Sequence, residues 1–256
     1  MTTLNADQRA QLTQLIKAQS KHSEYQFLHP LLTDALDLDY QPAGKHEMQR
    51  QAYMQAHVSV AGKTVLDIGA NTGFFSLAAL QAGASNVVCV EGNTQHAQFM
   101  QACAQILNLS DRMEVRNEYH NFVKETKTHF DVTLCLNVLH HLGDDFGNAT
   151  LGREEAKQQM IQALNHLASQ TKILWFQLGF NWKGDRHAPL FENGLKSELI
   201  EFVTNHTSDH WHIQKIAVVH PDTLAYVDAT GSMLDRFDQL GEFLNRPLFL
   251  MESKRT

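Results

Sequence analysis

The sequence predicts an α/β fold with a mostly parallel, seven-stranded sheet and helices on both faces. From Lys63 onward, short apolar segments alternate with longer segments whose apolar residues recur at helical spacing. The short segments are hydrophobic at successive positions, as in strands that are buried on both faces. Hydrophobic residues make up 43% of the 256 residues, which is enough for one sizeable core.

The expected elements follow in order along the chain. The predicted strands cover residues 63–69, 86–92, 112–117, 130–137, 172–179, 211–220 and 246–253. The predicted helices between them cover residues 73–83, 93–109, 154–169 and 195–206. Strands that alternate with helices are typical of a parallel sheet covered by its crossover connections.

The first 44 residues are expected to form a helical extension, and residues 45–256 the main domain. Helical spacing of apolar residues covers residues 4–21, and a short helix is expected after Pro30. The pattern breaks at Gln41-Pro42-Ala43-Gly44, and a further helix is expected over 44–58.

Composition narrows the class of protein. The start of the chain lacks a basic segment followed by an apolar one, and no run of about 18 apolar residues occurs, so we expect no membrane span and a cytoplasmic location. A formal charge of −7 without a dense basic run speaks against nucleic acid as a partner. Cys89, Cys103 and Cys135 lie in apolar contexts without CxxC spacing, which indicates reduced, buried thiols.

The stretch VLDIGANTGFFSL, residues 65–77, predicts a strand, a tight turn and a helix start. Gly69 and Gly73 would allow a ligand to approach the backbone closely, at the carboxyl end of a strand where open α/β sheets bind ligands. Asp67 precedes this turn, and the next strand ends at Glu91. A carboxylate at that second strand end is typical of folds that bind a nucleoside through its ribose hydroxyls.

These two stretches, VLDIGANTGFFSL and VVCVEGN, resemble the class I S-adenosylmethionine-dependent methyltransferases, whose fold is Rossmann-like. Asn71 stands at the middle position of the family's G-x-G-x-G motif, and in this the first motif also resembles that of the FkbM-type O-methyltransferases. The resemblance implies S-adenosylmethionine as cofactor, and implies that Glu91 holds the ribose hydroxyls. It further implies that the methionine part lies against Asp67, Gly69, Ala70 and Gly73, and the adenosine against Gly92 and Asn93. Asn71 belongs to the same cofactor-binding turn.

The resemblance implies further contacts to the cofactor from four other residues. Asn117, Glu118 and Tyr119 follow the third strand, where the family sets a polar residue near the adenine amine and an apolar wall. Arg50 falls where some members place an arginine on the cofactor carboxylate, and a guanidinium suits that task. A solvated arginine on a helix face is the alternative for Arg50.

The fourth strand leads into the residues expected to carry the chemistry. The strand ends at Asn137, which we expect near the cofactor, and His140 and His141 follow. Methyl transfer to a hydroxyl requires removal of a proton, and a histidine has a suitable pKa for that role. Either histidine is a candidate base, and a structural role at the turn is the alternative.

A polar and aromatic loop follows the fifth strand. Lys183 and Arg186 in this loop would suit an anionic acceptor, and a plain surface loop is the alternative. We expect no metal site. His206, His210 and His212 with Asp209 are rich in ligand atoms, but they lie in a predicted loop without an HExxH motif.

We therefore expect a methyltransferase that modifies an oxygen of a small molecule or a glycan intermediate. Methylation of RNA or protein is the alternative within the enzyme class. A non-catalytic protein that keeps the fold as a binding module is the alternative outside it. A nicotinamide oxidoreductase is disfavoured because the first turn lacks the G-x-G-x-x-G pattern.

Overall fold

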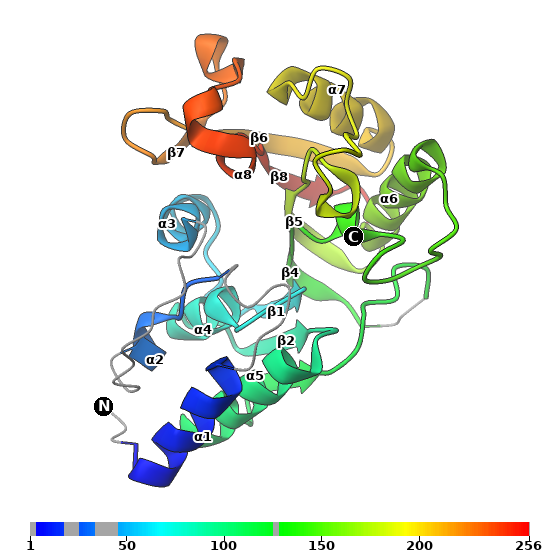
Figure 1. Cartoon of the computed structure of the whole chain (residues 1–256). Helices are drawn as coiled ribbons and strands as arrows, with labels where there is room; N and C mark the ends of the chain where they lie inside the picture. The colour runs from blue at the N-terminus through cyan, green and yellow to red at the C-terminus, as the bar shows by residue number, and fades with distance from the viewer. Residues whose placement is uncertain (1–3, 18–25, 34–45, 125–127, 256) are drawn as a thin grey trace. The chain divides into compact units, whose positions relative to one another are not determined.

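The computed structural model describes residues 4–17, 26–33, 46–124 and 128–255. The chain forms two compact units, residues 1–120 and 121–256 (Figure 1).

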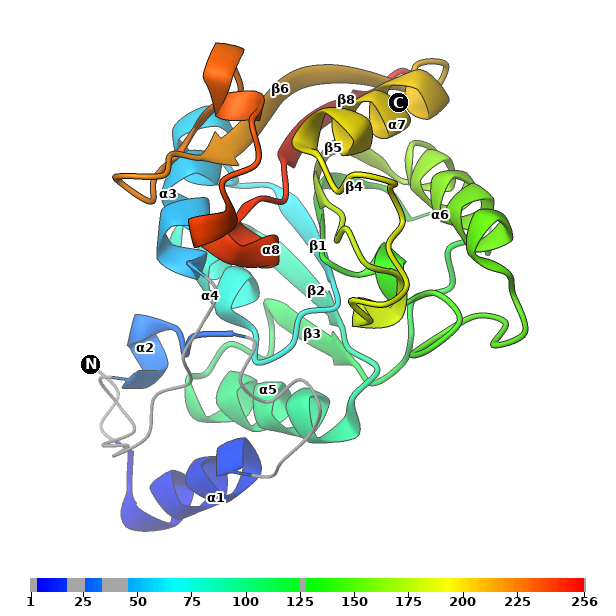
Figure 2. The same cartoon turned by 45° about the horizontal axis from the view of Figure 1, so that its top comes forward.

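The first unit contains three parallel strands in the order β3-β2-β1, which lie side by side in Figure 2. They are β1 (Thr64–Ile68), β2 (Asn86–Val90) and β3 (Met113–Arg116). Its helices are α1 (Ala6–Lys17), α2 (Pro30–Thr33), α3 (Glu47–His57), α4 (Phe74–Gln81) and α5 (Thr94–Ile106). α1 lies along α5 (Figure 1).

The helix α4 is a central part of the core of the first unit. Its residues from Phe74 to Leu80 are all buried, and a helix that is apolar on every side must lie inside the protein. The next helix, α5, begins with a conventional cap, because the side chain of Asn93 accepts hydrogen bonds from the N–H groups of Gln95 and His96. Each of these two helices begins after the short turn that follows a strand, and these turns are the predicted ligand-binding turns.

The second unit contains five strands in the order β4-β5-β8-β6-β7. They are β4 (Phe130–Leu136), β5 (Thr171–Gln177), β6 (Trp211–Val219), β7 (Tyr226–Asp228) and β8 (Leu248–Ser253). The α-helices are α6 (Arg153–Leu167), α7 (Lys196–Thr207) and α8 (Gly241–Leu244). Short 3-10 helices are η1 (Leu139–His141), η2 (Trp182–Gly184), η3 (Gly231–Leu234) and η4 (Asp238–Leu240).

The strands confirm the α/β class and correct its details. β4 and β5 are parallel, but β8 pairs antiparallel with both β5 and β6, and β7 pairs antiparallel with β6. The described residues hold eight strands, so the prediction of seven was wrong. The strand that was missed, β7, has three residues, which is too short for a hydrophobic alternation to be recognised.

The other sequence predictions have separate outcomes. The three cysteines are buried and free, as predicted. The predicted boundary between residues 44 and 45 lies outside the described residues, as does the part of the second predicted helix beyond Thr33. None of the described helices is long and apolar enough to cross a membrane.

Candidate active site

The turn between β1 and α4 is held close to the end of β2. The N–H groups of Gly69 and Ala70 both donate to the Val90 carbonyl, at 2.8 and 3.2 Å. Asn71 and Gly73 have positive φ angles of 54° and 82°. Asparagine is among the few residues other than glycine that tolerate this conformation, so Asn71 suits the middle of the turn.

Glu91 joins this turn to the turn after β2. One carboxylate oxygen accepts a hydrogen bond from the Asn71 N–H at 2.7 Å, and the other accepts one from the Asn93 N–H at 2.7 Å. The side chain is 9% exposed, so the carboxylate is nearly buried but reaches the surface. Each carboxylate oxygen can accept more than one hydrogen bond, so the carboxylate that fixes the two turns can also accept from hydroxyl groups of a ligand.

Asp67 is buried at the end of β1. Its carboxylate accepts a hydrogen bond from the Ser76 hydroxyl of α4 at 2.6 Å. Burial raises the pKa of Asp67 from its ordinary value of 3.8 to about 6, although the hydrogen bond from Ser76 acts in the opposite direction. The nearby Glu91 carboxylate raises the pKa further, so a cationic group of a ligand would relieve an unfavourable concentration of negative charge.

The aromatic ring of Tyr119 fills the space that a side chain at position 92 would need. A Cβ built on Gly92 would lie 2.2 Å from a ring carbon of Tyr119, so a side chain at position 92 would require this ring to move. The ring is 52% exposed, which is unusual for a large aromatic side chain. Asn117 fixes the same region, because its amide donates to the Glu91 carbonyl at 3.1 Å. Glu118 is exposed.

Arg50 lies inside the first unit. It is 2% exposed, and its guanidinium carbon lies 5.4 Å from the centre of the Phe75 ring at the start of α4. The alternative of a solvated arginine is therefore wrong. A buried guanidinium beside the first turn of α4 is a suitable partner for a carboxylate.

The first unit as a whole fits a nucleoside that carries an amino acid group. Glu91 offers the acceptors that ribose hydroxyls need, and the exposed Tyr119 ring offers a stacking surface for a base. Asp67 and Arg50 bring one negative and one positive group to the turn that carries Gly69 and Gly73.

In the second unit, a ring of hydrogen bonds fixes the end of β4. Asn137, which has a positive φ of 62°, donates from its amide to the Gln177 side-chain oxygen at 2.9 Å. Gln177 in turn donates to the Arg246 carbonyl, and Arg246 donates to the Asn137 side-chain oxygen at 2.8 Å. Arg246 also pairs with Glu242. Sequence patterns gave no signal for Gln177 or Arg246, because these residues lie 40 and 109 positions from Asn137 in the chain.

The two candidate histidines have different surroundings. His140 is 1% exposed, and its Nδ1 accepts a hydrogen bond from the Gly179 N–H at 3.2 Å. A Cβ on Gly179 would lie 2.8 Å from the His140 ring, so the two residues are closely packed. His141 is partly exposed, and its Nδ1 lies 3.3 Å from a carboxylate oxygen of Asp145.

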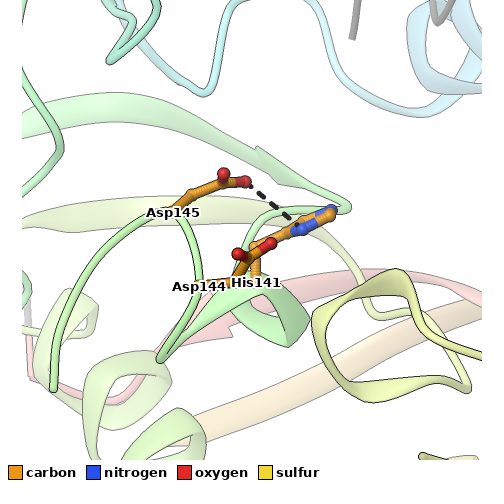
Figure 3. A group of neighbouring side chains, drawn as sticks. All are labelled: His141, Asp144 and Asp145. Atoms are coloured by element: carbon orange, nitrogen blue, oxygen red, sulfur yellow. Dashed lines mark ion pairs between the residues drawn. The ribbon is translucent and has the colours of Figure 1, made fainter. Parts of the chain in front are cut away.

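The loop after His141 also brings Asp144 near, as Figure 3 shows. Ligand atoms of His141, Asp144 and Asp145 lie within 4.8 Å of one another, a spacing that a divalent cation could bridge. The same spacing suits a histidine base with an orienting carboxylate. Among the described residues, His206, His210 and His212 do not form such a group. The absence of a metal remains a prediction.

The loop that carries Lys183 packs against the loop that carries His141. The indole N–H of Trp182 donates to the Leu142 carbonyl at 2.7 Å. A Cβ on Gly184 would lie 3.6 Å from the His141 ring, so η2 is a direct neighbour of that histidine. The Lys183 ammonium lies 4.3 Å from the centre of the Trp182 ring, and Arg186 is exposed.

The chain is similar to known methyltransferases, in sequence over part of its length and in fold. The family model for ribosomal protein L11 methyltransferase (PrmA) matches residues 44–156. Two structures of the bifunctional kinase-methyltransferase WbdD are 15% and 18% identical to this chain, with TM-scores of 0.57 and 0.52. Each alignment covers 94% of this chain but only 47% and 46% of WbdD, so the chain spans under half of that protein's length.

A further similar structure is magnesium protoporphyrin IX methyltransferase from Synechocystis PCC 6803 with bound S-adenosylmethionine. It is 17% identical over 80% of this chain and 76% of that chain, with a TM-score of 0.49.

The chain has the fold of the class I S-adenosylmethionine-dependent methyltransferases, and the family match over residues 44–156 supports such an enzyme with S-adenosylmethionine as its cofactor. The family match covers both turns of the first unit and the histidine loop of the second. The resemblance to FkbM-type enzymes in the first motif remains a prediction.

Proposed function

We propose that this enzyme methylates a hydroxyl oxygen of a small molecule or a glycan intermediate, with His141 as the general base. The observation that supports this most directly is the position of the Asp145 carboxylate 3.3 Å from His141 Nδ1. A carboxylate beside Nδ1 orients the imidazole and favours the tautomer with its proton on Nδ1, so that Nε2 can accept a proton.

In this mechanism S-adenosylmethionine supplies a methyl group activated on a sulfonium sulfur. Glu91 would hold the ribose hydroxyls of the cofactor, Asp67 its ammonium group and Arg50 its carboxylate. His141 would accept the proton of the acceptor's hydroxyl group at Nε2, and Asp145 would stabilise the resulting imidazolium.

His140 has a different role in this proposal. The Gly179 N–H donates to its Nδ1, and the ring is almost fully buried. His140 therefore stabilises the loop that carries His141 and does not exchange protons with an acceptor. Lys183 and Arg186 belong to the neighbouring loop and are proposed to contact the acceptor. Two cations there would favour an acceptor with a negative group.

The test compares His141→Asn and Asp145→Asn with His212→Asn, a control at an exposed histidine of β6. Transfer of labelled methyl groups is measured on a panel of sugars, phosphorylated sugars and small phenols. Loss of a general base should lower kcat by about 10²–10⁴-fold in His141→Asn, with the dissociation constant of S-adenosylmethionine unchanged. Full activity in both His141→Asn and Asp145→Asn would refute the assignment of the base.

Methylation of a protein is the second candidate, and the match to the ribosomal protein L11 methyltransferase family supports it. RNA is the third acceptor class. Labelled S-adenosylmethionine added to a cell lysate with the enzyme distinguishes these acceptor classes. Protease treatment would remove a labelled protein, and ribonuclease treatment would remove a labelled RNA. A label that survives both treatments favours the small-molecule or glycan acceptor.

A further inference from the structure

The segment from Gln26 to Thr33 is packed into the first unit. Gln26 is 7% exposed, His29 2%, and Leu28 and Leu32 are buried more completely. The His29 ring lies 5.4 Å from the Phe74 ring at the start of α4. Burial lowers the pKa of His29 from 6.5 to about 4, so the ring is neutral at physiological pH and packs as an apolar group.

Gln26 makes two hydrogen bonds to the cofactor turn. Its side-chain oxygen accepts from the Thr72 hydroxyl at 3.0 Å and from the Phe74 N–H at 3.0 Å. Thr72 lies between Asn71 and Gly73, which both have positive φ angles. One buried amide therefore joins the turn to the first residue of α4.

This contact replaces a cap that the local sequence lacks. The first N–H groups of a helix have no acceptor inside the helix, and a polar side chain at the N-cap position normally supplies one. The residue at that position of α4 is Gly73, and no side-chain cap is formed there. Gln26, which lies 48 residues earlier in the chain, supplies the acceptor instead.

We propose that Gln26 is a positioning residue of the cofactor site, which makes docking of the segment 26–33 a condition for tight binding of S-adenosylmethionine. The proposal rests on the assignment of the cofactor to the turn at 69–73. The turn that faces the cofactor then has two supports: Glu91 fixes Asn71, and Gln26 fixes Thr72 and Phe74. Because linkage is reciprocal, binding of the cofactor must also favour docking of this segment.

The test uses three variants at position 26 and one control. Gln26→Leu keeps the size of the side chain but removes the acceptor, Gln26→Glu keeps an acceptor oxygen, and Gln26→Asn shortens the side chain. Gln14→Leu makes the same change at an exposed position of α1. Binding of S-adenosylmethionine and S-adenosylhomocysteine is measured by calorimetry, and hydrogen exchange is measured on peptides that contain Phe74.

Removal of the two hydrogen bonds should raise both dissociation constants about tenfold in Gln26→Leu and accelerate exchange at Phe74. Gln26→Glu and Gln14→Leu should stay within about twofold of the unmodified protein. The kcat at saturating cofactor should change little, because the residue acts on binding and not on the acceptor. If Gln26→Leu does not fold, Gln26→Asn should show the same direction of change, since its oxygen no longer reaches both donors.

Unchanged binding and unchanged exchange in Gln26→Leu and Gln26→Asn would overturn the proposal. A Gln26→Glu variant as weak as Gln26→Leu would overturn it too, because the acceptor oxygen would then not be the cause. These results differ from a failure of the cofactor assignment, in which the unmodified protein would bind neither sulfur nucleoside.

Discussion

Replacement of Asp67 by Asn should make the protein more stable at neutral pH and a poorer binder of its cofactor. Asp67 is 4% exposed, and burial raises its pKa from 3.8 to about 6. Between pH 3.8 and about pH 6, Asp67 keeps its proton in the folded protein but releases it in the unfolded chain. The free energy of unfolding therefore falls as the pH rises through this window, and the loss is complete above about pH 6.

The size of the effect follows from the shift of this one group. A rise in pKa from 3.8 to about 6 corresponds to about 3 kcal/mol of stability lost at pH 8. Asparagine has the same shape, has no charge to desolvate, and can still accept the hydrogen bond from Ser76. The stability of Asp67→Asn relative to the unmodified protein should therefore increase by up to about 3 kcal/mol between pH 4 and pH 8.

Urea denaturation at a series of pH values from 4 to 8 measures this difference. Asp111→Asn, at an exposed carboxylate of the first unit, is the control and should show no such trend. The reasoning is refuted if the stability of Asp67→Asn relative to the unmodified protein is the same at pH 4 and pH 8. Calorimetry at pH 8 should show weaker binding of S-adenosylmethionine, because the negative charge that suits its ammonium group is gone.

Further predictions concern the contact between Gly92 and Tyr119, the Glu91 carboxylate, the packing of His140, and metal ions. Gly92→Ala would place a methyl group inside the Tyr119 ring, so the ring must move, and cofactor binding should weaken by about tenfold in calorimetry. Glu91→Gln presents N–H groups to backbone N–H donors and should weaken binding by about 10- to 100-fold, with Glu91→Asp less affected. Gly179→Ala would collide with His140 and should lower the free energy of unfolding by about 1–3 kcal/mol, measured by urea denaturation. Methyl transfer should be unaffected by EDTA, and loss of activity that added Mg²⁺ or Mn²⁺ restores would contradict the metal-free prediction.

Much of the first unit could be predicted because its signals are local. Val65 to Gly73 specifies a buried strand followed by a tight turn within a few residues, and Glu91 ends the next apolar run. The structure brings Asp67, Glu91 and Asn71 together around one turn, as expected from strands that end at the same edge of a parallel sheet.

The support for these residues could not be predicted in the same way. Gln26 reaches the turn from 46 residues away, and Arg246 reaches Asn137 from 109 residues away. A polar residue in a loop has no periodicity that shows its partner, so such long-range contacts need the folded structure. The pair His140 and His141 was ambiguous for the same reason, because only burial and the neighbours Gly179 and Asp145 distinguish the two rings.

We expect the first unit to hold a sulfur nucleoside through Glu91. Calorimetric titration of the full chain with S-adenosylhomocysteine tests this directly, with Glu91→Ala and a titration with NAD as comparisons. We predict saturable binding of S-adenosylhomocysteine that is lost or greatly weakened in Glu91→Ala, and no binding of NAD. A folded protein that does not bind S-adenosylhomocysteine, or that binds it equally well without the Glu91 carboxylate, would show that the first unit does not hold a sulfur nucleoside in this way.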